Sequence, residues 1–438
     1  MKERLKSILL FFLVIMSIYM TYLLWISFPE SSIFTKKSTA LQVDIFHIIR
    51  PQYTIINLDN GKKEYVKKED QFLKLWENTI AYVKNCNSIK DYNIDKSTWD
   101  EKGRDFSLHF YMYDGFNAEL FKELFKELLS DNKTFFKKLN GTFEISEVLF
   151  DLENGWIYIK NNKKDKYTAL ECEANTKNIT NHIKSLNNQD VTVCQTVYQS
   201  GYNDYFINGN LFLPTYNKDF TIEKLFNKDI YGYGYLNKII SNLFINMSVV
   251  REINENSGFI VYTDGIKSLR FHKSDFIEFY NTSTDNNLSD QNASLNFALN
   301  FLSQTGISLN KIHLATIKKL NNNYEFYFNY NANLPLRVLD KYADYYPIVV
   351  KINGGDIKYA FIKLLNLYPG GYYPDEILSP EKILKDISET LKIKMPIDNL
   401  KLVYLYKDNH LILSWELKKD KNIYYINAFD GKLIDDGV

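Results

Sequence analysis

Histidine and carboxylate side chains are the groups in this sequence best suited to bind a metal ion or transfer protons, so their spacing decides which chemistry is open. The 438-residue chain has six histidines, and none lies four positions from another or beside a cysteine or carboxylate pattern typical of a metal site. They are His47, His109, His182, His272, His313 and His410. We predict packed or exposed strand histidines and no metal ligand among them.

Other sequence patterns that signal catalysis or cofactor binding are missing as well. The sequence has no G-x-S-x-G elbow, P-loop, G-x-G-x-x-G fingerprint or S-x-x-K set. Carboxylate pairs such as Asp435 with Asp436, or Glu171 with Glu173, are typical of a solvated surface, because nothing places either pair across a cleft. We therefore predict no catalytic residue, no cofactor and no enzymatic activity.

The N-terminus carries a run of 21 uncharged residues, from Ile8 to Phe28. At about 1.5 Å per residue the run reaches roughly 30 Å, the thickness of the hydrocarbon core of a bilayer. It is longer than a secretory h-region, and no A-x-A-like cleavage site follows it. The basic residues before it favour a cytoplasmic N-terminus. We predict a single-pass anchor in the cytoplasmic membrane, with the lipid bilayer as a partner and everything after the anchor extracytoplasmic.

Two groups of residues in this run have predicted roles. Ser17 and Thr21 lie four residues apart and, with Leu24, form one face on which a partner helix is able to approach closely. The alternative is that the Ser17 and Thr21 hydroxyls bond their own helix backbone and face lipid. The amphipathic rings in the outer half of the run favour the headgroup region and fix the depth of the helix. They belong to Tyr19, Tyr22 and Trp25.

Charge and cysteine content limit the remaining possibilities. The chain has 53 basic and 53 acidic residues mixed along its length, so a nucleic-acid-binding surface has no compositional support. Its three cysteines are Cys86, Cys172 and Cys194, too few for a disulfide framework. Cys172 and Cys194 are able to pair, but the odd count allows three pairings, and buried free thiols are an equal alternative.

Length and turn-rich segments predict several domains of α+β class behind the anchor. After the anchor, apolar residues recur at the period of 3.6 that is typical of amphipathic helices. Other segments have strand patterns joined by turn pairs such as Asn154-Gly155 and Asp264-Gly265. The polar run Asn281–Asn292 indicates a boundary. The predicted limits are a tail at 1–7, a transmembrane helix at 8–28, a stem at 29–42, and three domains of antiparallel meanders packed with helices at 43–164, 165–288 and 289–438.

Individual elements follow from the same patterns. Helices are predicted at Gln71–Val83, Ala118–Leu129, Ile222–Asn227, Leu236–Phe244, Ala293–Leu302 and Pro380–Leu391. Strand predictions that matter below include Val43–Arg50, Phe143–Phe150, Phe259–Thr263 and Leu411–Leu417. Gly354-Gly355 and Gly370-Gly371 are both predicted to lie in turns.

Four segments resemble the YycH family, whose members are accessory proteins of the essential WalK/WalR (YycG/YycF) cell-wall sensor kinase system in low-GC Gram-positive bacteria. They are "LKSILLFFLVIMSIYMTYLLW" at the anchor, "DIFHIIRP" at Asp44–Pro51, "LFINMSVVREINENSGFIVYTDGIKSLRF" at Leu243–Phe271 and "LILSWELKKDKNIYYINAFDGKLI" near the C-terminus. The last also resembles the closing hairpin of the sister protein YycI, so the third domain is expected to be YycI-like. The chain departs from the family at Asn246 and Met247, where an acidic residue and a proline are usual.

The resemblance implies a non-enzymatic regulator that binds the histidine kinase WalK together with YycI and changes its signalling equilibrium in cell-wall homeostasis. It does not indicate whether the protein activates or inhibits the kinase, in what stoichiometry the proteins bind, or through which surfaces. The alternative function is an extracytoplasmic sensor module that binds a wall-derived or peptide ligand in a cleft between domains.

Overall fold

The computed structural model describes most of the chain and divides it into two units. The described residues are 12–21, 45–84, 89–124, 143–161, 166–172, 175–206, 212–214, 222–227, 233–272, 276–283, 290–320, 323–339, 345–373, 376–389 and 396–435. The units are Met1–Gln42 and Val43–Val438.

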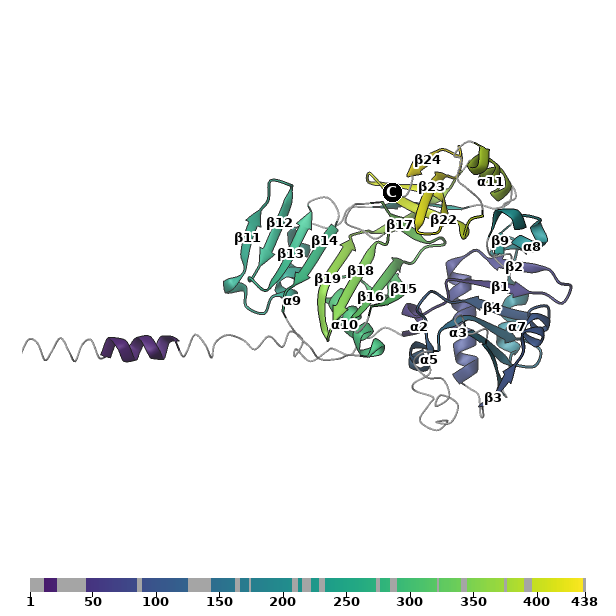
Figure 1. Cartoon of the computed structure of the whole chain (residues 1–438), viewed down its shortest axis with the longest axis horizontal. Coiled ribbons are helices and arrows are strands. Elements are labelled where there is room, and N and C mark those ends of the chain that lie inside the picture. The colour runs from purple at the N-terminus through teal and green to yellow at the C-terminus, as the bar shows by residue number, and fades with distance from the viewer. Residues whose placement is uncertain are drawn as a thin grey trace, which may run out of the picture. The chain divides into compact units, whose positions relative to one another are not determined.

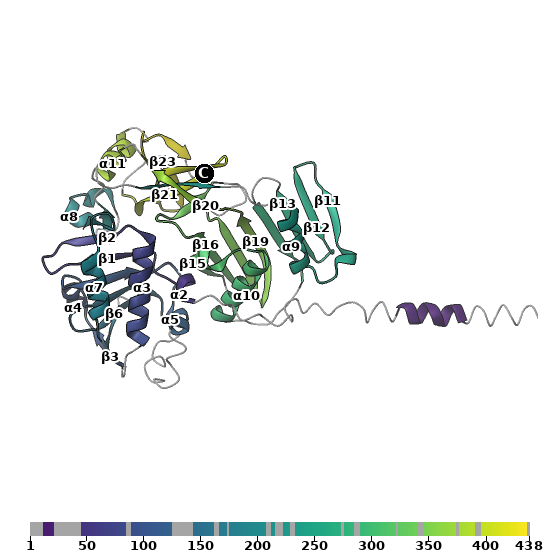
Figure 2. The same ribbon diagram turned by 180° about the vertical axis from the view of Figure 1, so that it is seen from behind.

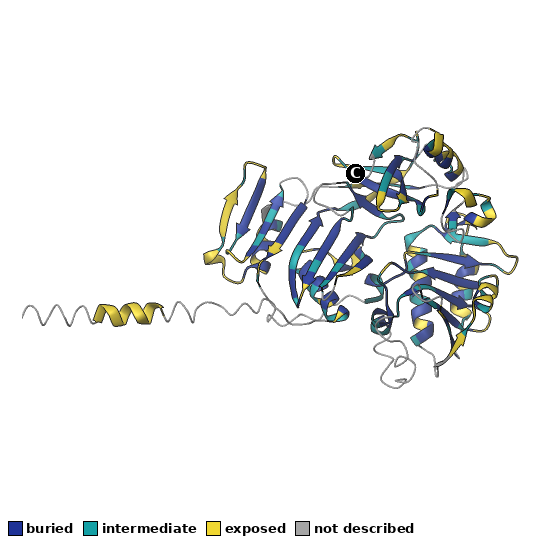
Figure 3. Ribbon diagram, in the orientation of Figure 1, coloured by how far each residue is buried: buried dark blue, intermediate teal, exposed yellow. Residues whose placement is uncertain are grey.

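The described part of the first unit is a helix over residues 12–21 with exposed side chains (Figure 3). Within the described ranges, no helix combines the length and apolar character that crossing a membrane requires. Residues 8–11 and 22–28 of the predicted anchor lie outside those ranges, as do the predicted tail at 1–7 and stem at 29–42. The anchor therefore stays a prediction.

The second unit begins with a nine-stranded antiparallel sheet. Its strands, in spatial order, are β3 (Ile89–Ile94), β7 (Lys166–Cys172), β6 (Ile157–Asn161), β5 (Ile145–Asp151), β4 (Ser107–Tyr111), β1 (Tyr53–Asn57), β2 (Lys63–Val66), β8 (Val191–Thr196) and β9 (Phe212–Pro214). The helices and turns of this region are α2 (Ile45–Ile48), α3 (Glu69–Lys84), α4 (Lys96–Lys102), α5 (Ala118–Leu124), α7 (Lys177–Ser185), α8 (Val197–Ser200) and η2 (Asn203–Tyr205).

Helix α3 covers one face of this sheet, as Figure 2 shows. Its buried side chains recur at three- and four-residue spacing, which confirms the predicted amphipathic helix. Trp76 meets Phe110 of β4 edge-on, with ring centroids 5.1 Å apart, and Tyr82 meets Phe150 of β5 at 4.6 Å. Because successive strand residues point to opposite faces, His109 and Glu147 lie on the face that α3 leaves free.

An eight-stranded antiparallel sheet follows. Its spatial order is β11 (Arg251–Asn254), β12 (Phe259–Thr263), β13 (Lys267–His272), β14 (Phe276–Asn281), β19 (Asp356–Lys363), β18 (Ile348–Asn353), β16 (Asn323–Tyr330) and β15 (Ile312–Leu320). Helix α10 (Gln291–Gln304) packs on one face, beside α9 (Tyr233–Leu243) (Figures 1 and 2). The short turns η3 (Met247–Val249) and η4 (Leu309–Lys311) precede β11 and β15.

The C-terminal region forms a five-stranded sheet, to which α11 (Pro380–Glu389) is adjacent in the chain. Its order is β17 (Leu336–Val338), β21 (Asn399–Lys407), β22 (His410–Lys419), β23 (Asn422–Asn427) and β24 (Leu433–Asp435). A separate two-stranded sheet pairs β10 (Glu223–Asn227) with β20 (Leu367–Tyr372). Helices packed with predominantly antiparallel sheets confirm the predicted α+β class.

Strands from both sides of residue 288 share the eight-stranded sheet, because β14 pairs directly with β19. The predicted domain limits 43–164, 165–288 and 289–438 concern which parts of the chain fold independently. They stay predictions. The cysteines are clearer. Cys172 is disulfide-bonded, whereas Cys194 is free and buried, so these two do not pair with each other. Cys86, the third cysteine, lies outside the described residues.

Three local predictions are wrong. Residues 45–48 form the short helix α2 where a strand was expected at Val43–Arg50, and the expected helix Ile222–Asn227 is strand β10. Gly370-Gly371 lie inside β20, not in a turn. The strand requires a glycine at position 370 for a steric reason. A Cβ there would lie 1.9 Å from Cε2 of Phe226 on β10. A glycine in β20 therefore lets the Phe226 ring cross the neighbouring strand.

One backbone contact joins the nine-stranded sheet region to the eight-stranded sheet. The Ile317 N–H donates to the Asp114 carbonyl at 3.0 Å, and the Thr316 hydroxyl donates to the same oxygen at 3.1 Å. Nearby, the Asn117 amide donates to the Gln291 side-chain oxygen at 2.6 Å. The loop after β4 is thus held against β15 and α10.

We predict that Gly115→Ala destabilises the chain by roughly 2–4 kcal/mol, from left-handed backbone strain together with overpacking. Gly115 has φ +84°, and a Cβ there would lie 2.3 Å from the Ile317 carbonyl oxygen. Gly61→Ala is the matched control, because Gly61 has φ +76° but no atom within 4 Å of the added Cβ. Urea unfolding of the full chain measures both. Equal losses for the two variants would contradict the close approach.

Candidate functional site

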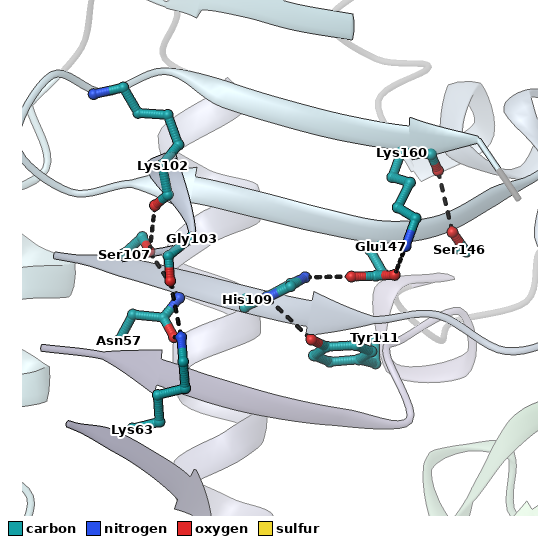
Figure 4. Close-up of polar contacts among 10 residues, drawn as sticks. All are labelled: Asn57, Lys63, Lys102, Gly103, Ser107, His109, Tyr111, Ser146, Glu147 and Lys160. Carbon is teal, nitrogen blue, oxygen red and sulfur yellow. Dashed lines mark hydrogen bonds and ion pairs between the residues drawn. The ribbon is translucent and has the colours of Figure 1, made fainter. Parts of the chain in front are cut away.

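A group of polar side chains around the buried His109 lies on the face of the nine-stranded sheet opposite α3, where Trp99 of α4 packs against the His109 ring (Figure 4). Nε2 of His109 on β4 lies 2.8 Å from the Glu147 carboxylate on β5, and the Tyr111 hydroxyl lies 3.1 Å from Nδ1 of the same ring. Lys160 on β6 forms an ion pair with the other oxygen of Glu147. With a carboxylate at Nε2, the neutral ring donates from Nε2 and accepts the Tyr111 hydroxyl at Nδ1.

The surroundings fix the protonation states of this group. Burial lowers the pKa of His109, and the hydrogen bond to Glu147 offsets that effect only in part. Burial alone would raise the pKa of Glu147, but the hydrogen bond from His109 and the positive charge of Lys160 outweigh it and lower the pKa to about 2. At neutral pH the group is therefore a neutral imidazole, a carboxylate and an ammonium that satisfy one another.

A second polar chain lies on the same face at β1 and β2. The Lys63 ammonium donates to the Asn57 side-chain oxygen at 2.6 Å and to the Gly103 carbonyl at 2.8 Å, and Asn57 donates to the Ser107 hydroxyl at 2.9 Å (Figure 4). Cys194 stands opposite Lys63 on β8, and burial raises the pKa of its thiol to about 12. A protonated, buried thiol is a poor nucleophile.

Another buried cation connects the α3 region to the eight-stranded sheet. Arg50, which is 3% exposed, forms an ion pair with Glu69 at the start of α3, and its Nη2 donates to Nδ1 of His313 on β15 at 2.6 Å. Burial and the adjacent Arg50 charge hold the pKa of His313 well below its ordinary value. His313 is thus neutral. Its Nδ1, which also lies 3.0 Å from the side-chain amide of Asn331, accepts the guanidinium hydrogen bond, and this adds a side-chain link to the Asp114 backbone contact.

The C-terminal sheet has its own ion cluster. Nε of Arg337 on β17 donates to Glu416 on β22 at 2.6 Å, and Lys401 on β21 lies 3.0 Å from the other carboxylate oxygen. The Arg337 guanidinium also lies over the Tyr346 ring, 4.7 Å from its centroid. Burial opposes ionisation of Glu416, yet the two cations lower its pKa to about 2. This cluster is likewise satisfied within itself.

The histidines do not come together. His109 and His313 lie in separate buried clusters, His272 stacks on Phe276 at 5.1 Å, and His47 is 3.6 Å from Glu77. Among the described residues, no group of three or more His, Cys, Asp or Glu side chains is arranged to hold a metal ion. The sequence showed no pattern for the His109 group, because its members come from three strands whose register only the fold sets.

The residues predicted in the membrane face are described in part. Ser17 and Thr21 lie in the helix over residues 12–21, and the Thr21 hydroxyl donates to the Ser17 carbonyl oxygen at 2.8 Å. The Thr21 hydroxyl therefore bonds its own backbone, as one of the two interpretations expected. Tyr19 is 57% exposed. Leu24, Tyr22 and Trp25 lie outside the described residues, so the roles predicted for this face and for the aromatic anchors stay predictions.

Comparisons with known proteins place this architecture. No family model matches the sequence. The two-component system WalR/WalK regulatory protein YycH of Bacillus subtilis (strain 168) is 26% identical over 288 residues, which span 61% of this chain and 59% of that protein. The crystal structure of YycH from Bacillus subtilis aligns with a TM-score of 0.62 and 18% identity, over 87% of this chain and 97% of that one. The predicted resemblance to the YycH family is confirmed.

We predict that Glu147→Gln lowers the stability of the chain at neutral pH by about 1–3 kcal/mol, because it removes the carboxylate that bonds the buried His109 ring and pairs with the partly exposed Lys160. A carboxylate whose folded pKa is lowered from 4.5 to about 2 stabilises the fold fully above pH 4.5, and that stabilisation is lost as pH falls towards 2. The variant should therefore lose less stability than the natural chain between those two values.

Thermal unfolding of both chains between pH 7 and pH 3 measures the difference. Glu64→Gln serves as control, since Glu64 pairs with Lys62, whose side chain is 44% exposed, and such a pair contributes about 0–1 kcal/mol. If the two variants had the same pH profile, the His109–Glu147–Lys160 group would not carry this stabilisation.

Proposed function

We propose that this chain, a relative of the YycH proteins in sequence and fold, is a membrane-anchored, non-enzymatic regulator that binds the sensor histidine kinase WalK together with YycI. The observation that carries the proposal is the match to a curated WalR/WalK regulatory protein combined with a shared fold over 97% of the solved YycH chain. The aligned sequence spans 59% of that relative, so kinase and YycI binding are proposed for this chain and are properties to be tested.

The interior of the chain is compatible with action through binding. The carboxylates of Glu147 and Glu416 are each paired with two basic side chains from other strands of the same sheet. Such a body presents a fixed surface to a partner. A bound regulator shifts a two-state kinase only by its differential affinity for the two states, and about 1–3 kcal/mol of coupling changes the equilibrium 5- to 150-fold.

The proposed localisation follows from the apolar run at Ile8–Phe28, with the N-terminus in the cytoplasm and the remaining chain extracytoplasmic. The anchor then places Ser17, Thr21 and Leu24 where a kinase helix is able to pack. The Thr21 hydroxyl donates its hydrogen to the Ser17 carbonyl oxygen. This face therefore favours a partner helix through its small side chains, which allow close approach, and less through a hydrogen bond from Thr21.

We expect full-length chain in detergent-solubilised membranes to capture WalK when YycI is present, and the Ser17→Leu/Thr21→Leu variant to capture it about tenfold less, a loss of about 1.4 kcal/mol. Quantitative immunoblotting of the co-purified kinase measures both. Thr21→Val keeps the shape without the hydroxyl and should bind normally. Ile15→Leu, a change on another face of the same helix, is the matched control.

Failure of the natural chain to capture WalK even with YycI would overturn the proposal. In that case the alternative, an extracytoplasmic module for a wall-derived or peptide ligand, becomes the leading function. Saturable binding of muropeptides to the full chain would then be the observation that supports it.

A further inference from the structure

Strand β11 is an open edge of the eight-stranded sheet. All four of its residues, Arg251 to Asn254, are exposed, and among the described strands it pairs only with β12 (Figure 3). Glu255 N–H donates inwards to the Phe259 carbonyl at 2.9 Å. Since antiparallel strands alternate the direction of their backbone groups, Glu252 and Asn254 direct theirs away from the sheet.

The opposite edge of the same sheet is covered in a way that β11 is not. On β15 the Ile317 N–H and the Thr316 hydroxyl bond the Asp114 carbonyl, and a register shift interrupts the strand between Leu314 and Thr316. Bulges, prolines, lysines and covering segments are the usual means of blocking edge pairing. Strand β11 has no proline, lysine or register shift, although it is only four residues long and carries the charges of Arg251 and Glu252.

Ile253 ends a continuous row of paired residues across one face of the sheet. The register runs from Ile253 to Val261, then through Arg270 and Glu278 to Phe361, Val349, Tyr327 and Thr316. Val261, Phe361, Val349 and Tyr327 belong to one buried apolar cluster. Ile253 itself is 49% exposed, so the row stops at the edge with an apolar side chain in solvent.

The sequence of this edge is complementary to itself. When two copies of the segment run antiparallel about a two-fold axis at Ile253, each Arg251 faces Glu255 of the second copy, Glu252 faces Asn254, and the two Ile253 side chains meet. Opposite charges and apolar residues directly across an antiparallel pair stabilise it, whereas like charges destabilise it. In this register the outward backbone groups of Glu252 and Asn254 also face each other across the axis.

We propose that β11 pairs with β11 of a second copy of this chain about a two-fold axis at Ile253, which joins two eight-stranded sheets into one continuous sheet. A closed two-fold contact uses the same patch on both copies and does not propagate into a filament. The segment that precedes β11 in the chain also has exposed apolar side chains, which belong to Ile245, Met247 and Val249. The inference stands independently of any binding to a kinase.

Disulfide trapping of the full chain in membranes tests the pairing. Ile253→Cys places two thiols on the axis, where directly opposed Cβ atoms lie about 4.5–5.5 Å apart, close to disulfide geometry. We expect mild oxidation with copper phenanthroline to convert this variant to a covalent dimer. Ile266→Cys is the control, because Ile266 is 48% exposed but lies in the β12–β13 turn, away from the axis. It should form no covalent dimer.

A charge exchange in the Ile253→Cys background tests the register. Arg251→Glu sets two carboxylates against each other and should slow cross-linking about threefold to tenfold, and Glu255→Arg should do the same with two cations. The double exchange restores opposite charges and should restore the rate. Glu255→Arg also loses the intrachain contact of Glu255 with Arg270, 3.2 Å away, so it is compared with the double variant, which shares that loss.

The proposal is overturned if Ile253→Cys cross-links no faster than Ile266→Cys, or if the double exchange stays as slow as the single variants. The kinase-capture experiment does not decide it, because a chain that fails to bind WalK is still able to pair through β11.

Discussion

The nine-stranded sheet region of the second unit meets the eight-stranded sheet at the close approach of Asp114–Gly115 to Ile317. The Asp114 carbonyl accepts both the Ile317 N–H and the Thr316 hydroxyl, and the glycine leaves room for the Ile317 carbonyl. This approach covers the β15 edge together with helix α2, and it helps to hold the nine-stranded sheet region against the eight-stranded sheet. The Arg50–His313 hydrogen bond lies on the same strand and adds a side-chain link between the two regions.

Two ion clusters of the unit share one arrangement, in which a carboxylate is held between two basic groups from other strands of the same sheet. Glu147 lies between His109 and Lys160, and Glu416 lies between Arg337 and Lys401. Removing such charges from water costs free energy. The ion pairs offset part of that cost, but only in the strand register that brings the charged groups together. These clusters therefore penalise register slips that an apolar face would tolerate, which matters in a chain with such long meanders.

Local elements were predictable where the signal was local. The spacing of Phe72, Leu75 and Trp76 identified α3, and the Asp264-Gly265 pair identified the turn between β12 and β13. Two of the three errors, at β10 and at β20, occurred where distant pairing decides the structure. Residues 223–227 become a strand because β20 lies beside them, some 140 positions later in the chain, and no helical or strand period within five residues carries that information. The His109–Glu147–Lys160 group was missed for the same reason.

Predicting function from sequence had a different limit. General acid–base catalysis is most effective when a group titrates near the working pH, yet Glu147 and Glu416, with pKa values of about 2, and Cys194, with a pKa of about 12, lie far from neutral pH. Basic partners hold the two carboxylates ionised, and burial holds the thiol protonated. Interaction with a partner then takes place at the surface. On the described surface, the outward backbone N–H and C=O groups of β11 have no strand partner and lie beside the exposed Ile253 side chain. A structural edge of this kind recognises another strand through backbone hydrogen bonds, and its side chains select which strand.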